Sequence, residues 1–93
     1  MQVLSTGEAR SRLDRLQGWK IEDGALVRIF KFKDFRAALH FVNRVGELAE
    51  KAGHHPDIDI RYNRVRLSLT THDAGGLTEA DFNLAGQAEK LAE

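Results

Sequence analysis

Three histidines carry the most evident chemistry in this chain. His54 and His55 are adjacent and precede Pro56, the only proline, while His72 follows further along the sequence. An imidazole titrates near neutral pH, so one ring can donate a proton while another accepts one. Such a group suits a reaction that needs an acid and a base, such as the loss of water. Solvated surface histidines are the alternative reading of the same pattern.

Two carboxylates are placed to border the same site. Glu50 falls on the last turn of a helical pattern that ends before the histidine pair, and Asp81 falls on the first turn of a predicted C-terminal helix. Three histidines and a water can also hold a catalytic zinc. Adjacent residues of an extended segment point to opposite sides, however, so His54 and His55 are badly placed to ligate one ion. We therefore expect no metal and no cofactor.

A predicted β-hairpin would bring the third histidine back to the other two. Residues 57–62 alternate between polar and apolar side chains, as does a second run over residues 65–72, with Asn63-Arg64 as the predicted turn. The far ends of a hairpin lie together, so His72, at the end of the last strand, is expected opposite residues 55–57. Tyr62 is expected to contribute packing rather than chemistry.

The other segments predict the elements that hold this hairpin. Asp23-Gly24 between two apolar runs is a strong turn signal, which pairs residues 19–22 with residues 25–32. The predicted helices cover residues 6–17, between a Ser5-x-x-Glu8 capping box and Gly18, residues 35–52, and a segment capped by Thr78. The order α-β-β-α-β-β-α predicts an α+β fold, a four-stranded antiparallel sheet with three helices packed on one face.

The strand predicted over residues 25–32 is apolar on both faces. Leu26 and Phe30 point one way, while Val27 and Ile29 point the other. A strand with one wet face should carry polar residues there. Either the chain covers both faces, or the outer face meets another subunit, and we expect oligomerisation through this strand.

Composition narrows the class of protein. The 93 residues suit a single domain over residues 1–93, and Lys+Arg and Asp+Glu balance at 14 each. A neutral chain argues against direct nucleic-acid binding, which requires a basic face. The absence of cysteine suits the cytoplasm, and we expect neither a secretory signal nor a membrane segment.

The spacing of the chemical residues resembles the signature of the pterin-4a-carbinolamine dehydratase family. The matching pattern is Glu50-x3-His54-His55-Pro56-x5-Tyr62-x9-His72-x8-Asp81. Further matches are Gly18-Trp19, FKFKDF at residues 30–35, YNRV at 62–65 and TTHDAGGLTEADFNLA at 70–85, so the resemblance covers nearly the whole chain.

The resemblance implies a hydro-lyase. Such an enzyme dehydrates 4a-hydroxytetrahydrobiopterin, or a related pterin carbinolamine, to quinonoid dihydropterin, and so recycles the pterin cofactor of aromatic amino acid hydroxylases. Family members have a four-stranded antiparallel sheet with helices on one side. They assemble as dimers or tetramers, so the resemblance also implies a homodimer or homotetramer and a functional link to a hydroxylase.

The resemblance also implies roles for the site residues. His54, His55 and His72 would line the pterin pocket, with His54 and His72 as acid and base in an order left open. His55 would bind and polarise the substrate. Asp81 would hold a histidine or contact the pocket edge, and Glu50 would accept hydrogen bonds from the guanidine-like edge of the pterin.

Two further residues enter by resemblance. Trp19 would stand at the pocket rim, with core packing as its alternative, and Pro56 would fix the backbone so that the two histidine rings diverge. The chain departs from many relatives at Ile58, where they carry an aromatic residue. Arg61 and Arg66 have no family role and are expected to be solvated.

Two other functions stay open. Animal relatives also serve as dimerisation cofactors of a homeodomain transcription factor, so a non-catalytic binding module is one alternative. A role in molybdopterin metabolism is the other, because the same site residues would serve it.

Overall fold

Two β-hairpins supply the strands of one antiparallel sheet. In the computed structural model, which describes residues 2–93, β1 (Lys20–Glu22) pairs with β2 (Ala25–Lys31), and β3 (Asp57–Arg61) pairs with β4 (Arg64–Leu69). β2 also pairs with β4, so the strand order is β1-β2-β4-β3. The element order and fold class predicted from the sequence are confirmed.

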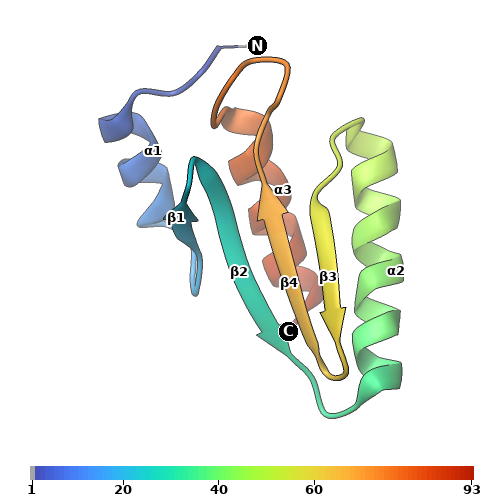
Figure 1. The fold of residues 1–93 in the computed structure, drawn as a ribbon. Helices are drawn as coiled ribbons and strands as arrows, with labels where there is room; N and C mark the ends of the chain where they lie inside the picture. Colours follow the sequence, from blue (N-terminus) through green and yellow to red (C-terminus); the bar gives the residue numbers. More distant parts are fainter. Residues whose placement is uncertain (1) are drawn as a thin grey trace.

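Three helices complete the fold (Figure 1). They are α1 (Thr6–Leu13), α2 (Phe35–Ala52) and α3 (Glu79–Leu91). α3 crosses behind the strands, α2 runs on the β3 side and α1 on the β1 side (Figure 1). No helix within residues 2–93 has the length and apolarity needed to cross a membrane.

The core lies between the sheet and the helices. The stripe of α2 that is buried consists of Ala38, Phe41, Val45 and Ala49, and the Phe41 ring lies 4.7 Å from that of Phe30 on β2. Phe35 and Leu39, although apolar, lie outside this stripe and are 46% and 39% exposed. A helix advances about 100° per residue, so one stripe fills the contact with the sheet and its neighbour faces outward.

The first helix ends earlier than predicted. The capping box at its start is present, since the Glu8 amide donates to Ser5 Oγ and the Ser5 amide to Glu8 Oε1. α1 stops at Leu13 instead of residue 17. The amide of Gln17 donates to Glu89 Oε1 on α3 at 2.8 Å, which draws the chain out of the helical path.

The two hairpin turns differ in how well the sequence predicts them. Asp23 and Gly24 both have positive φ, at 51° and 77°, as a type I′ turn requires. The second turn lies at Tyr62-Asn63, one residue before the predicted position. Asn63 fixes it, because its side-chain amide donates to the Phe32 carbonyl at 2.8 Å. Tyr62 is 67% exposed, so it does not pack in the core of the chain.

The segment after β4 is a loop rather than a continued strand. β4 ends at Leu69, and the Thr71 amide donates to the Gly76 carbonyl, so His72 lies in a turn and not on the predicted strand. Val3 and Leu4 lie against this loop. The Leu4 amide donates to the Leu77 carbonyl at 2.8 Å, and a Cβ at Gly76 would come within 3.0 Å of Val3 Cγ1.

Candidate active site

One surface hollow brings the three histidines together. It has a volume of about 240 Å³ and is lined by residues 53–55, where α2 gives way to β3, and by residues 70–73, after β4. Gly53, at φ 63°, ends α2 and turns the chain into the histidine pair. Asp57 pairs with Ser68, so the histidine pair continues alongside Thr70 and Thr71, and His72 is not directly opposite residues 55–57 as predicted.

His54 is tied to a buried carboxylate. Its Nε2 lies 2.6 Å from Oδ1 of Asp81 in the first turn of α3, and the side chains are 14% and 0% exposed. A buried carboxylate needs compensating donors. This contact joins the end of the α2–β3 connection to the start of α3.

Two threonines supply the remaining donors to Asp81. Oδ2 of Asp81 accepts a hydrogen bond from the Thr71 hydroxyl and another from the Thr78 amide, both at 2.9 Å. The two hydroxyls lie 2.8 Å apart. Sequence reasoning missed Thr71, whereas the Thr78-x-x-Asp81 spacing of a capping box indicates the other partner.

This network determines which nitrogen of His54 carries hydrogen. An ionised carboxylate only accepts hydrogen bonds, so Nε2 of His54 is the donor to Asp81. Nδ1 is then the nitrogen left to accept or release a proton. A carboxylate in this position also stabilises the imidazolium that forms when the ring takes up a proton.

The neighbouring ring has a more exposed partner. His55 Nε2 lies 2.5 Å from Glu50 Oε2 on the last turn of α2, and the side chains are 60% and 78% exposed. Exposed pairs of this kind hold their geometry weakly. Both groups are therefore free to turn toward a ligand in the hollow.

His72 has no such support. Its side chain is exposed and makes no hydrogen bond or ion pair within residues 2–93. The hollow thus combines one histidine that is fixed by a buried acid with one that is unpaired, an asymmetry that suits separate acid and base roles.

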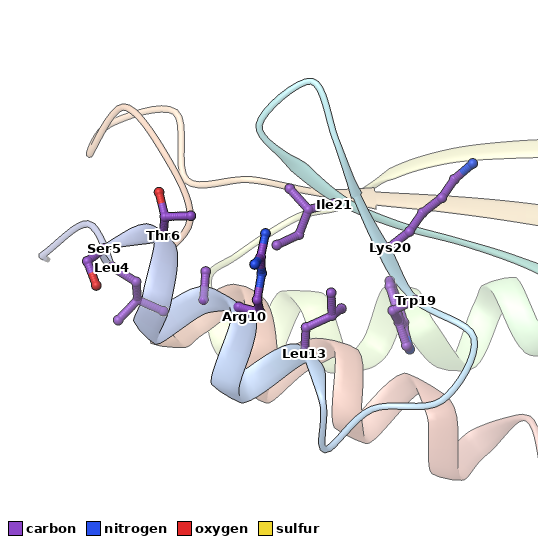
Figure 2. Close-up of a pocket in the computed structure, with 9 residues that line it drawn as sticks. Leu4, Ser5, Thr6, Arg10, Leu13, Trp19, Lys20 and Ile21 are labelled. Atoms are coloured by element: carbon purple, nitrogen blue, oxygen red, sulfur yellow. The ribbon is translucent and has the colours of Figure 1, made fainter.

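Trp19 is not part of this hollow. It is 7% exposed and packs edge-on against Phe30, with ring centroids 5.8 Å apart. It also borders a separate hollow of about 480 Å³ between α1 and β1, together with Arg10 and Ile21 (Figure 2). The structure therefore favours the core-packing alternative for this residue. Pro56 follows the histidine pair directly and leads into β3 at Asp57.

No group of histidine, cysteine and acidic side chains that could hold a metal ion occurs in residues 2–93. The three rings meet around a hollow, but the two that have acidic partners bind different carboxylates. The arrangement can move protons between a bound ligand and imidazole, which is the chemistry of an acid–base site.

Comparison with known proteins identifies relatives of this chain. The family model described as pterin 4 alpha carbinolamine dehydratase matches residues 2–91. Proteins from Acidobacterium capsulatum and Thermomicrobium roseum, provisionally named pterin-4-alpha-carbinolamine dehydratases, are 57% and 55% identical. These alignments cover 98% and 99% of this chain and 99% of each relative.

Two solved structures share the fold. One, titled transcriptional coactivator/pterin dehydratase from Brucella melitensis, is 38% identical, has a TM-score of 0.96, and covers 99% of this chain and all of its own. The other, titled a pterin dehydratase-like protein identified as a RuBisCO assembly factor in the alpha-carboxysome, is 25% identical with a TM-score of 0.70. That match covers 83% of this chain and 95% of the neighbour.

Proposed function

The chain belongs to the pterin 4 alpha carbinolamine dehydratase family, and from this we propose that it dehydrates 4a-hydroxytetrahydrobiopterin or a related pterin carbinolamine. The product would be quinonoid dihydropterin, which returns the pterin cofactor to an aromatic amino acid hydroxylase. The observation that carries this proposal is the hollow shared by His54, His55 and His72, with His54 bound to the buried Asp81.

The reaction needs one proton removed and one delivered. We assign His54 as the base: its Nδ1 takes the proton from the ring nitrogen beside C4a, and the freed electron pair forms the C=N bond. The C4a–oxygen bond breaks, and His72 protonates the departing hydroxyl to give water. Asp81 stabilises the His54 imidazolium, and solvent returns the protons to their starting places.

The surrounding residues would bind the ring system. A hollow of about 240 Å³ is smaller than the roughly 300–1,000 Å³ of common ligand sites, so a pterin would keep one face outside it. His55 would polarise the substrate, and Glu50, once released from His55, would accept hydrogen bonds from the guanidine-like edge. Pro56 would fix the backbone between the rings and β3.

The test follows the decay of 4a-hydroxytetrahydropterin with the wild-type protein and with His54→Ala and His72→Ala. Each substitution should lower the rate by about a hundredfold or more, the usual scale for an acid–base group. His40→Ala, an exposed histidine on α2, is the matched control and should leave the rate unchanged. Equal rates for all four proteins would remove the catalytic proposal.

A non-catalytic role is the second candidate, because the solved neighbours have titles that name a transcriptional coactivator and an assembly factor. A folded protein that shows no dehydration of any pterin carbinolamine would favour it. A molybdopterin substrate would use the same residues and is separated by assay with that pterin. We place the reaction in the cytoplasm, in keeping with a chain that has no cysteine.

A further inference from the structure

Three cations form a row across the helix-free face of the sheet. Arg64 on β4 is paired with Lys31 on β2 and with Arg61 on β3, so the three side chains are direct cross-strand neighbours. Like charges in this position repel one another. The chain as a whole has balanced charge, at 14 basic and 14 acidic residues, so the row is a local concentration.

Acidic groups within the chain compensate the row incompletely. Arg61 reaches Asp59 at 3.4 Å, and Arg66, in the next row, reaches Glu22 at 3.5 Å. The side chains of Lys31 and Arg64 make no hydrogen bond or ion pair within residues 2–93.

Glu22 is shared with a closer partner. Lys20 lies 2.9 Å from it, and this hydrogen bond lowers the pKa of Glu22, which keeps the carboxylate charged but largely engaged. Glu22 therefore compensates Arg66 only in part, and it makes no ion pair with the three cations of the row.

The surface beside the row has the features of a protein–protein interface. Ile29 is 58% exposed, and a hollow of about 270 Å³ lies over it, bordered by Asp59 and by Arg61, Arg64 and Arg66. An apolar centre surrounded by arginine is typical of protein–protein contact surfaces. None of the lining residues is aromatic, so the surface lacks the stacking platforms that bind single-stranded nucleic acid.

A second copy of this chain is a poor occupant of the surface. Docking about a two-fold axis would bring the same patch against itself, and its three arginines outnumber its one acid, Asp59, so two net positive surfaces would meet. No buried polar side chain lines the hollow, so it is not built for a small ligand either.

We propose that the helix-free face, around Ile29, Lys31, Arg61, Arg64 and Arg66, binds an acidic peptide segment of a partner protein. The carboxylates of the segment would pair with the cationic row, and an apolar side chain would cover Ile29. The row lies at the turn end of the β3–β4 hairpin, whereas the histidines lie at its other end, so this function is separate from catalysis.

The test is titration of a short fluorescein-labelled peptide of Asp-Glu-Leu repeats, followed by anisotropy. Arg64→Glu should weaken binding about tenfold or more. Arg44→Glu is the matched control, because Arg44 is exposed on α2 and the charge change is identical. Amide shifts on binding should map to β2, β3 and β4, and the dehydratase rate should stay unchanged in both variants.

Several results would overturn the proposal. They are equal weakening by the two variants, equal displacement of the peptide by inorganic phosphate, and tighter binding of a single-stranded oligonucleotide than of the peptide. Arg64→Gln removes the positive charge without adding a negative one. It replaces Arg64→Glu in the titration if that charge reversal disturbs the hairpin. Since Arg64→Glu relieves like-charge contacts, its melting temperature should not fall below that of the wild type.

Discussion

At the scale of single residues, Asp81 links the buried core to the candidate active site. It is fully buried, and three hydrogen bonds from His54, Thr71 and Thr78 satisfy its oxygens. A buried carboxylate that lost one of these donors would be poorly compensated. The position of His54 therefore depends on the Thr71 hydroxyl and the Thr78 amide, and we propose Thr71 and Thr78 as positioning residues.

Substitutions at this network should change how His54 is held. Asp81→Asn places an amide next to Nε2 that can donate a hydrogen bond, so the ring should move to the other tautomer and the rate should fall by about a hundredfold or more. Thr71→Val removes one donor and should lower kcat by about tenfold with little change in KM.

The measurement is side-chain ¹⁵N NMR of His54 alongside steady-state kinetics. The wild type should show hydrogen on Nε2, and the Asp81→Asn protein should not. Thr70→Val is the control, because Thr70 lines the same hollow but bonds only to the Gly24 carbonyl. An unchanged tautomer in Asp81→Asn would contradict the positioning role, whatever the rate.

At the scale of elements, caps set where helices begin. The Ser5 backbone amide donates to the Glu8 carboxylate and lowers the pKa of Glu8 below its usual 4.5. A lowered folded-state pKa means that the bond stabilises the fold above the unfolded value. That contribution is lost as pH falls through the folded-state pKa.

Glu8→Gln should therefore flatten the acid side of the stability curve. Glutamine keeps an acceptor at every pH but has no charge to lose, so the difference in melting temperature between wild type and variant should shrink from pH 6 toward pH 3. Thermal melts followed by circular dichroism over this range check it. A difference that stays constant with pH would show that the Glu8 charge does not contribute.

The sequence predicts the elements better than their ends. Asp23-Gly24 has the residue types that a type I′ turn requires, so local chemistry decides it. The end of α1 and the Tyr62-Asn63 turn depend on Glu89 and Phe32, which are remote in sequence.

The candidate site likewise has a part that the sequence predicts and a part that depends on contacts remote in sequence. Residue types and spacing indicate the three histidines and both acids, whereas the contact of Thr71 with Asp81 depends on the loop that follows β4. The resemblance left Trp19 between the pocket rim and the core, and the structure places it beside a different hollow, because spacing along the chain does not give its distance from the histidine pair.

At the scale of the whole molecule, an apolar surface lies outside the core at the start of α2. Phe35, Leu39 and Tyr62 are all exposed and border a hollow of about 460 Å³ at the start of α2. The outer face of β2 exposes less apolar surface, because Val27 is covered within the chain and Ile29 is surrounded by arginine. Oligomerisation stays a prediction, and we now expect it at the start of α2.

A double substitution, Phe35→Glu with Leu39→Glu, should convert an oligomer into a folded monomer, because it places charge where apolar surface would be buried. Sedimentation velocity across a concentration series measures this. Ile29→Glu should leave the oligomer intact. Dissociation by Ile29→Glu alone would move the interface to the outer face of β2, and a wild-type monomer at high concentration would refute oligomerisation.

The bond between Leu4 and Leu77 has a practical consequence. The Leu4 amide donates to the Leu77 carbonyl, and Val3 lies close to Gly76. The first described residues therefore lie against the loop that carries His72. An affinity tag fused ahead of Gln2 would thus emerge beside that loop and could slow turnover while leaving the melting curve unchanged. Kinetic comparisons are better made with the tag cleaved or moved behind Glu93.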